Sequence, residues 1–262
     1  MLIERCDDID NSKLEKYFTP QNHAQTEFAN IASHEMKTSI QAILTYSELL
    51  QNKHDEFREN YVKAILRNAL RLKVLSNNLC NLTRIDGKIL KLKKERLDLN
   101  LLVSSIANDF ENMNRYHDYK QEIKVLVISS KHIFVEADKE RLEQVIFNLL
   151  DNAIKFTNKG TIQIKLENIS DENWTEITIT DTGPGIDDTI MPNLFNKFVT
   201  SSYHGTGLGL YICKNIIEAH NGKIWAKNNT NKKGASITCR IPTNQELTNR
   251  DYTKFLNLET VS

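Results

Sequence analysis

The sequence predicts two domains. The first is an all-α helical hairpin that pairs with a second copy into a dimeric four-helix bundle, and the second is an α+β sandwich with a mixed, mostly antiparallel sheet. Residues 25–86 lack proline and glycine and keep a helical period of apolar residues, whereas the chain after Gly87 mixes period-two runs with helical ones. A change of architecture is therefore expected near Gly87.

The hairpin is predicted from two apolar stripes separated by the polar segment "QNKHDE". The first stripe consists of Phe28, Ile31, Ile40, Ile43, Leu44 and Leu50. The second is a heptad seam of Tyr61, Ile65, Asn68, Leu72, Leu75, Leu79 and Leu82. One hairpin encloses too little interior to be stable alone, so we expect a homodimer. The polar seam member, Asn68, either sets the register of the bundle or lies on its solvated rim.

Pattern also predicts where the parts of the chain begin and end. We expect an N-terminal arm or linker at residues 1–24, the helical domain at 25–87, the sandwich at 88–244 and a polar tail at 245–262. In the sandwich, helices are expected at 99–114, 139–156 and 207–222, and strands at 122–129, 132–138, 160–169, 174–181, 223–229 and 234–242. The basic segment before them, residues 88–99, is expected to be a connector and edge strand.

Composition argues against several classes of protein. The 34 basic and 34 acidic residues give no net charge, which argues against a general nucleic-acid binder. The four cysteines lie far apart without a CxxC pair, which indicates idle thiols in a reducing compartment and not a zinc site. No apolar run is long enough to cross a bilayer and no signal peptide begins the chain, so we expect a cytoplasmic protein without a membrane segment.

The helix expected at 139–156 has an apolar and a polar face. Its apolar set is Leu142, Val145, Ile146, Leu149, Ala153 and Phe156. Asn148, Asn152 and Lys155 form a separate polar strip. An amide oxygen is a suitable ligand for Mg²⁺ that already carries phosphate oxygens, and a lysine one turn later can meet a phosphate. Taken alone, this strip is more typical of an ordinary exposed face.

The glycines change that interpretation, because five of the nine lie within residues 183–209. Asp181 ends a strand, where its carboxylate can accept a hydrogen bond from an exocyclic amine such as that of adenine. Gly183 and Gly185 allow the backbone to turn sharply and to approach a flat ring. The glycines of "GTGLGL" (205–210) stand at the start of a helix, where free N–H groups face any phosphate placed there.

In this order the motifs resemble those of sensor histidine kinases. "NLLDNAIKFT", "DTGPGI", "LFNKF" and "GTGLGL" look like the N, G1, F and G2 boxes of the ATP-binding fold shared with gyrase, Hsp90 and MutL. "ASHEMKTSI" looks like the H box of the dimerisation and phosphotransfer domain. The resemblance covers about residues 27–243. It implies ATP and Mg²⁺ as ligands, a homodimer, and a response-regulator receiver domain as partner.

The resemblance implies a role for each matching residue of the nucleotide site. Asn152 is expected to bind Mg²⁺, with Asn148 beside the metal site and Lys155 at a phosphate. Asp181 is expected to read the adenine amine, in a pocket that the two glycines following it shape.

The later boxes are expected to hold the phosphates and a lid. Phe195 and Phe198 would anchor a mobile lid. The phosphates would be lined by Gly205, Thr206, Gly207, Leu208 and Gly209. Only six residues separate Phe198 from Gly205, so the lid is short, and the basic residue often found in it is missing. Lys197 is expected to substitute for that residue.

The H box places the phosphoacceptor at His34. Neutral imidazole is a competent nucleophile near pH 7, since its unperturbed pKa lies close by. Glu35 is expected to take up the proton of the other ring nitrogen, and Thr38 to orient a water that removes phosphate from the partner protein. The family usually has a proline after the threonine, where this chain has Ser39. That proline would loosen the helix below the histidine.

The function expected is therefore an ATP-dependent protein histidine kinase. It would phosphorylate itself on His34 and pass the phosphoryl group to an aspartate of a response regulator. Ser39 and the short lid favour an alternative, a nucleotide-binding dimeric scaffold or response-regulator phosphatase with weak kinase activity. An ATP-gated clamp like gyrase or Hsp90 is less well supported, because those relatives use a glutamate to activate water where this chain has Asn148.

Overall fold

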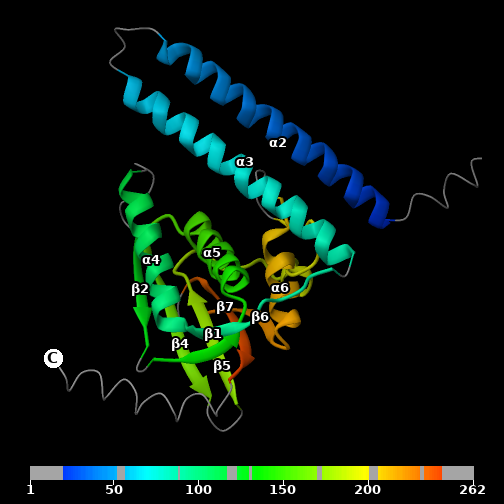
Figure 1. Cartoon of the computed structure of the whole chain (residues 1–262), viewed down its shortest axis with the longest axis vertical. Coiled ribbons are helices and arrows are strands. Elements are labelled where there is room, and N and C mark those ends of the chain that lie inside the picture. The colour runs from blue at the N-terminus through cyan, green and yellow to red at the C-terminus, as the bar shows by residue number, and fades with distance from the viewer. Residues whose placement is uncertain are drawn as a thin grey trace, which may run out of the picture. The chain divides into compact units, whose positions relative to one another are not determined.

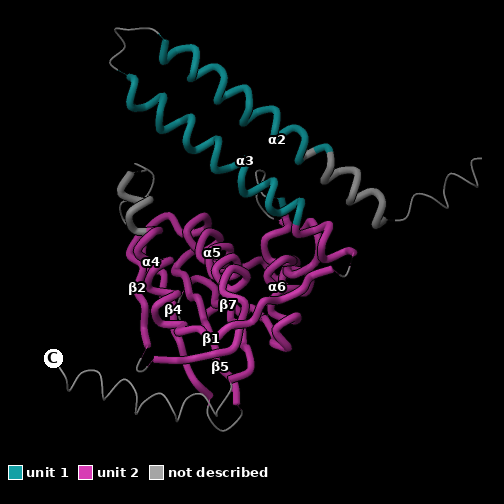
Figure 2. Tube along the Cα trace, in the orientation of Figure 1, with its two compact units in different colours: residues 1–80, 202–206 teal, residues 81–201, 207–262 magenta. Residues whose placement is uncertain are grey.

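The computed structural model describes residues 20–51, 57–87, 89–116, 123–129, 132–169, 173–200, 206–230 and 233–243. The chain forms two compact units (Figure 2). One comprises residues 1–80 with 202–206, and the other comprises residues 81–201 with 207–262. Most of the predicted N-terminal arm and all of the predicted tail lie outside the described residues.

The helical hairpin consists of α2 (Pro20–Leu50) and α3 (Arg58–Asp86), as expected (Figure 1). The residues of α3 from Asn81 onward belong to the second unit. Near the turn of the hairpin, the rings of Tyr46 on α2 and Tyr61 on α3 pack with their centroids 5.8 Å apart. This ring contact joins the two helices by side-chain packing, which supplies most of the stability of helices in proteins.

Only part of the predicted first stripe is shielded from solvent. On α2, Ile43 and Leu50 are half-buried, whereas Ile40 and Leu44 remain exposed. The side chains of Phe28 and Ile31 lie outside the described residues. The apolar surface of α2 is thus wider than the face that the hairpin itself covers.

The seam of α3 contains a buried amide. Asn68 is buried and its Nδ2 donates a 2.8 Å hydrogen bond to the Ala64 carbonyl one turn earlier. The expectation of a solvated rim position at Asn68 is therefore wrong. Leu75, further along the seam, is buried as well. Bonding to its own helix satisfies one amide proton of Asn68 without a partner from another element.

The second unit is built on a five-stranded sheet in the order β2-β4-β5-β7-β6. The strands are β2 (Ile123–Ile128), β4 (Gly160–Ile169), β5 (Trp174–Thr180), β6 (Lys223–Asn228) and β7 (Ala235–Pro242). β2 pairs with β4 in parallel, and the other neighbours pair antiparallel. The prediction of a mixed, mostly antiparallel sheet is confirmed.

Helices α4 (Leu99–Tyr116), α5 (Lys139–Phe156) and α6 (Gly209–Ala219) cover one face of this sheet (Figure 1). The register places one apolar row under them, in which Ile164 stands opposite Ile179, Ile179 opposite Ile237, and Ile237 opposite Ala226. A slip of one residue would move this row to the outer face. Burial of alternate strand residues therefore fixes the register.

The outer face of the sheet is polar and internally paired. Thr178 bonds to Thr238 at 3.0 Å, and Thr180 bonds to Ser236 at 2.9 Å, so hydroxyl pairs cross from β5 to β7. Such cross-strand pairs stabilise a sheet, and here they satisfy the hydroxyl groups of Thr238 and Ser236, which are buried.

Arg240 on β7 organises the other end of this face. Its guanidinium pairs with the Glu176 carboxylate at 2.5 Å. The same group lies 5.8 Å from the ring centre of Trp174 and 5.5 Å from that of Trp225. One cation on β7 thus contacts an acid and an aromatic ring on β5 and a second aromatic ring on β6.

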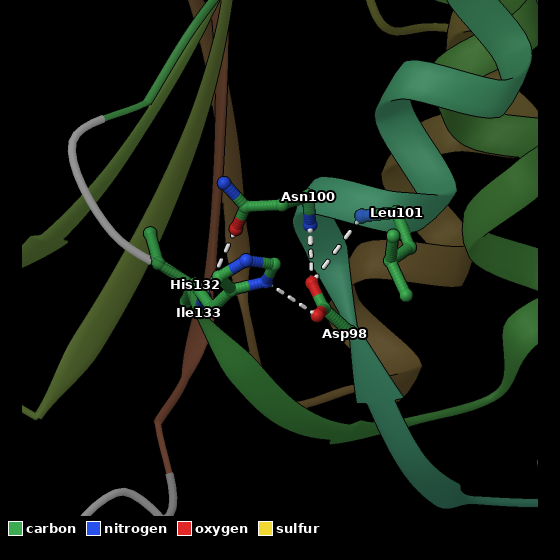
Figure 3. A network of polar contacts seen from close by, with 5 residues as sticks. All are labelled: Asp98, Asn100, Leu101, His132 and Ile133. Atoms are coloured by element: carbon green, nitrogen blue, oxygen red, sulfur yellow. Dashed lines mark hydrogen bonds and ion pairs between the residues drawn. The ribbon is translucent and has the colours of Figure 1, made fainter. Parts of the chain in front are cut away.

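A separate two-stranded sheet pairs β1 (Glu95–Asp98) with β3 (Phe134–Ala137). The edge strand predicted over residues 88–99 is thus only four residues long. Asp98 links this sheet to α4 (Figure 3): its Oδ1 accepts the N–H groups of Asn100 and Leu101, and its Oδ2 lies 2.7 Å from Nδ1 of His132. Asn100 in turn accepts the Ile133 N–H at 2.9 Å.

We expect Asp98→Ala to lower the free energy of unfolding by about 0.5–2 kcal/mol, because the first N–H groups of α4 lose their acceptor. Asp98→Asn should lose less, since an amide oxygen still caps the helix. Asp109→Ala, at an exposed position of the same helix, is the matched control. Urea unfolding followed by circular dichroism measures all three, and an Asp98→Ala midpoint equal to that of the control would contradict this role.

Candidate functional site

Helix α5 carries the polar strip as predicted in sequence. Its buried residues are Leu142, Val145, Ile146, Leu149, Leu150 and Ala153. Phe156, grouped with the apolar set in the sequence, is 39% exposed. On the strip, Asn148 and Asn152 are half-buried and Lys155 is exposed. Half-buried amides beside an exposed lysine leave polar atoms accessible to a ligand.

Asp181 follows β5 and is held by the backbone around it. Its Oδ1 accepts the Gly183 N–H at 2.8 Å and the Ala235 N–H at 3.3 Å. Its own N–H donates to the Ala235 carbonyl at 2.9 Å, and Asn229 Nδ2 donates to the Asp181 carbonyl at 3.2 Å. Among the described residues both bonds to the carboxylate go to Oδ1, so Oδ2 is left to accept from a ligand.

The surroundings of Asp181 disfavour the charged form of its carboxyl group. Burial raises the pKa of the Asp181 carboxyl, and the hydrogen bonds from Gly183 and Ala235 oppose that rise only in part. A raised folded-state pKa means that this group adds stability only at low pH, and that the contribution is lost as pH rises through that pKa. An ionised, partly desolvated acceptor at neutral pH is typical of a group that binds a donor on a ligand.

The loop after Asp181 is shaped by contacts that the sequence did not predict. Gly185 has φ +91, and a Cβ there would lie 2.9 Å from Asn228 Oδ1. Asn228 on β6 bonds Ile186 twice, accepting its N–H and donating to its carbonyl, both at 2.8 Å. Nothing in the sequence "NNT" at the end of β6 indicates that Asn228 holds the loop after Asp181.

Gly183 and Gly234 allow close backbone approach on either side of Asp181. A Cβ on Gly183 would lie 2.8 Å from the carbonyl oxygen of Phe156, at the C-terminal end of α5. A Cβ on Gly234, which has φ +109, would lie 2.0 Å from the carbonyl oxygen of Asp181. Gly234 was not predicted as a site residue, although its place before a strand at a sharp turn is a glycine position.

Between η2 (Met191–Asn193) and α6, the backbones of Phe198 and Gly207 lie against each other. Both residues have positive φ, +66 and +63, and the Phe198 N–H donates to the Gly207 carbonyl at 3.0 Å. A Cβ on Gly207 would lie 2.4 Å from the backbone of Phe198. Phe195 is half-buried nearby in sequence. Gly205 lies outside the described residues, so its expected place at the phosphates stays a prediction.

Helix α6 begins without a side-chain cap. Leu208, its N-cap residue, is fully buried and makes no side-chain cap hydrogen bond. The first N–H groups of a helix have no acceptor within the helix, and such a helix start is a suitable place for an anion. Asn148 Nδ2 donates to the Gly209 carbonyl at 3.4 Å, which links the polar strip to this helix end. Thr206, just before it, is half-buried.

These contacts place α5 between the two glycine segments. Its C-terminal end meets the loop of Gly183, and its Asn148 meets the start of α6. Asn152 lies on the strip between these two contacts in sequence. The arrangement brings an acceptor carboxylate, a half-buried amide and an uncapped helix start to one helix, as a nucleotide with its phosphates requires.

Lys197 has a different environment from the one predicted. Its Nζ lies 2.5 Å from Asp86 Oδ1, within the same compact unit, and 5.2 Å from the ring centre of Tyr211. Burial pulls the pKa of Lys197 down, but the Asp86 and Tyr211 contacts outweigh it and the pKa is raised. Lys197 is thus charged and engaged by protein groups, and a phosphate would have to compete with Asp86 for it.

His34 lies on α2 and its side chain is exposed, with Glu35 half-buried beside it. Thr38 Oγ1 donates to the His34 carbonyl at 2.9 Å. Ser39, which stands where the resembling family has proline, is buried. An exposed imidazole on a rigid helix is accessible to an incoming phosphoryl group.

In the described part of the chain, no group of three or more His, Cys, Asp or Glu side chains is placed to hold a metal ion. The described helices also include none with the length and apolar character of a membrane span.

Fold and site define a class: an α/β ATPase domain that follows a helical hairpin with an exposed histidine. Residues 24–88 match the family described as "His Kinase A (phospho-acceptor) domain". Residues 137–245 match the family described as "Histidine kinase-, DNA gyrase B-, and HSP90-like ATPase". The chain belongs to the sensor histidine kinases of two-component systems.

Individual relatives agree with this family. The sensor protein kinase WalK of Staphylococcus haemolyticus is 30% identical over 226 residues, which cover 82% of this chain and 36% of that protein. The chain thus spans about a third of the length of this curated relative. The solved histidine kinase AdeS of Acinetobacter baumannii has a TM-score of 0.58 at 28% identity, covering 80% of this chain and 98% of AdeS.

A second solved structure includes a partner protein. The histidine kinase ThkA in complex with the response regulator protein TrrA has a TM-score of 0.59 at 25% identity. The match covers 92% of this chain and 69% of that one. The relation therefore extends over both the helical and the α/β parts of the chain.

We expect Asp181→Asn to weaken nucleotide binding by about 1.5–3 kcal/mol, because a charged acceptor is replaced by a neutral one. Its thermal stability at neutral pH should be equal to or above that of the wild type, since the costly charge is gone while the amide oxygen still accepts from Gly183. Calorimetric titration with ATP and thermal unfolding without ATP measure the two effects. If Asp181→Asn had lower thermal stability and an unchanged affinity for ATP, Asp181 would be a structural residue and not a nucleotide ligand.

We expect Asp86→Asn to tighten nucleotide binding at low salt, because Lys197 is released from its carboxylate, and Lys197→Gln to weaken it. The gain should shrink as salt is raised, since both partners are partly exposed and their attraction is screened. Glu167→Gln, which removes an exposed ion pair with Lys165 on β4, is the control. Equal affinities for all three variants would mean that Lys197 does not contribute to binding.

Proposed function

We propose that this chain is an ATP-dependent protein-histidine kinase that phosphorylates itself on His34. The observation that carries this proposal is the placement of α5 between the Asp181 loop and the uncapped start of α6, in a chain whose helical hairpin exposes His34. The family membership of the chain supports the same activity. Since the chain spans only part of its curated relatives, the activity of the full protein is part of the proposal.

The nucleotide is proposed to bind with its adenine at Asp181 and its phosphates at α6. Asp181 Oδ2 accepts from the exocyclic amine, while Gly183 and Gly185 let the backbone approach the ring. The phosphates face the N–H groups at the start of α6. Lys155, exposed on the strip, supplies positive charge.

The residues present fit a Mg²⁺ ion that arrives with ATP. Asn152 is the proposed protein ligand, because its amide is half-buried on α5 and an amide oxygen suits a hard cation. Asn148, committed to the Gly209 carbonyl, lies beside the metal site and does not need to bind the ion. When bound, Mg²⁺ neutralises phosphate charge during transfer.

The reaction needs alignment and charge neutralisation more than covalent help from the protein. A ring nitrogen of neutral His34 forms a bond to the γ-phosphorus while the bond from that phosphorus to the bridging oxygen of ADP breaks. The proton on the other ring nitrogen is taken up by Glu35. Thr38, whose hydroxyl donates to the His34 carbonyl, is proposed to orient a water molecule that hydrolyses the phosphoryl group from a phosphorylated regulator.

The phosphoryl group is proposed to pass from His34 to an aspartate of a response-regulator receiver domain. ThkA was solved with such a regulator, TrrA. An exposed histidine on a helix, as here, is accessible to a second protein. The N–P bond of phosphohistidine breaks as the aspartate oxygen forms a bond to phosphorus.

The chain is proposed to act as a homodimer through its hairpin. Ile40 and Leu44 on α2 and Val62, Leu66 and Val74 on α3 are exposed in the single chain. Burying such residues against a second hairpin completes a four-helix bundle. On this proposal residues 25–87 are the dimerisation and phosphotransfer domain and residues 88–244 the ATP-binding domain.

Incubation with γ-labelled ATP and Mg²⁺ should give an acid-labile, base-stable label on the wild-type chain. His34→Ala should bind ATP but carry no label, and Asn152→Ala should lose label because it loses the metal ligand. Asn168→Ala, at an exposed position of β4, should label as the wild type does. Full labelling of His34→Ala would exclude this phosphoacceptor, and absence of any label on the wild type would favour the scaffold or phosphatase alternative.

A further inference from the structure

His220 ends helix α6 and is almost completely buried, with 2% of its surface exposed. Its Nδ1 lies 2.8 Å from the Ile216 carbonyl, to which it donates, so Nε2 is an acceptor. That acceptor receives the N–H of Asp138 at 3.0 Å, from a residue 82 positions earlier. The ring is therefore held as one neutral tautomer between two backbone groups.

Asp138 is itself a junction of three segments. It is the N-cap of α5, where its Oδ1 accepts the Arg141 N–H at 3.1 Å. Its Oδ2 accepts the N–H of Lys93 at 2.8 Å, from the segment that connects α3 to β1. Both carboxylate oxygens are thus occupied, and the His220 bond joins α6 to the connector and to the start of α5.

Helix α6 is consequently linked at both of its ends to α5, to the middle of α5 at one end and to its N-cap at the other. At the nucleotide end, Asn148 donates to the Gly209 carbonyl. At the opposite end, Asp138 donates to His220. Between these ends, Cys213 Sγ donates to the Val145 carbonyl at 3.8 Å. The spacing between the Asn152 strip and the start of α6 depends on these links, because packed helices move as rigid elements.

We propose that His220 is a positioning residue of the nucleotide site, and that its protonation releases the start of α5 from α6 and weakens ATP binding. The inference rests on the nucleotide site proposed above and assigns it a pH dependence. His220 does not touch the nucleotide, and it acts through Asp138 and the two helices.

Protonation removes the acceptor on which this link depends. A second proton on the ring would sit on Nε2 and face the Asp138 N–H, so two donors would meet. Both oxygens of Asp138 already accept a backbone N–H, one from Arg141 and one from Lys93. The ring would have to leave its place or Asp138 would have to turn, and either change separates the two helices.

The charges around the ring determine the direction of the effect. Burial lowers the pKa of His220, and Lys94 from the connector acts in the same direction, whereas the Ile216 carbonyl and Asp138 oppose it. A lowered folded-state pKa means that the unfolded chain binds the proton first. Stability should therefore be full above about pH 6.5, the value for an unburied histidine, and fall as pH drops below it. Nucleotide binding to the folded chain should weaken only at lower pH, as the ring takes up a proton in the folded state.

Two substitutions separate the two bonds of the ring. In His220→Gln the amide oxygen can reach the place of Nε2 and still accept the Asp138 N–H, whereas in His220→Asn the amide nitrogen can reach the place of Nδ1 and keep only the Ile216 bond. The dissociation constant of a fluorescent ATP analogue with Mg²⁺ is measured at about pH 7.5 and about pH 5.5. At the higher pH, His220→Asn should bind about three- to tenfold more weakly, and His220→Gln close to wild type.

At the lower pH, wild type should weaken relative to His220→Gln, because only wild type carries a titrating ring at this position. The ratio of the two cancels every titration that they share, including that of the terminal phosphate of ATP. His132→Gln, at the exposed histidine that pairs with Asp98 (Figure 3), is the matched control and should keep the pH response of wild type.

Three results would overturn the proposal. His220→Asn binding as tightly as wild type would show that the link does not matter. His220→Gln as weak as His220→Asn at about pH 7.5 would assign the loss to packing. A constant ratio of wild type to His220→Gln across pH would exclude the protonation. If His220→Asn does not fold, the wild-type and glutamine pair still decides the outcome.

Failure of the nucleotide site itself has a different signature. In that case wild type would not bind the analogue at neutral pH, or Asn152→Ala would bind Mg²⁺ and nucleotide as well as wild type does. Binding by wild type that Asn152→Ala loses, together with His220 variants that match wild type at each pH, would refute the positioning role alone.

Discussion

Helix α5 has to be buried on one face and left open on another, and the α/β unit is arranged around that requirement. Its apolar side chains, from Leu142 to Ala153, are covered by the sheet and by the neighbouring helices. The same burial leaves Asn148 and Asn152 half-buried on another face, where Asn148 donates to the Gly209 carbonyl of α6. Because the helix cannot rotate without exposing its core residues, the direction of the polar strip is fixed by hydrophobic burial and not by polar contacts.

Much of this architecture follows from local patterns. The order of helices and strands, the mixed sheet and the strip on α5 could be predicted because period and glycine placement are local properties of the chain. The exposure of Phe156 and the burial of Asn68 could not, since each depends on what lies opposite. The pairing of β1 with β3 in a separate sheet was missed for the same reason, although a strand was predicted in each place, because the two strands are far apart in sequence.

The contacts that complete the candidate site are of this second kind. Asn228 holds the loop after Asp181 from β6, and His220 holds the start of α5 from the far end of α6. Asparagine and histidine are common in loops and at helix ends, so neither residue type indicates in a sequence that it holds a distant segment in place. Positive φ at Phe198 is equally hidden, because a bulky aromatic residue is uncommon in that conformation.

The stacking of Trp174 and Trp225 on Arg240 has a spectroscopic consequence. These are the only two tryptophans of the chain, and both lie on the outer face of the same sheet. Intrinsic tryptophan emission therefore reports on the α/β unit and carries no direct signal from the helical hairpin. Melting followed by this emission and melting followed by far-ultraviolet dichroism, to which the long helices contribute strongly, would distinguish the two units without any added label.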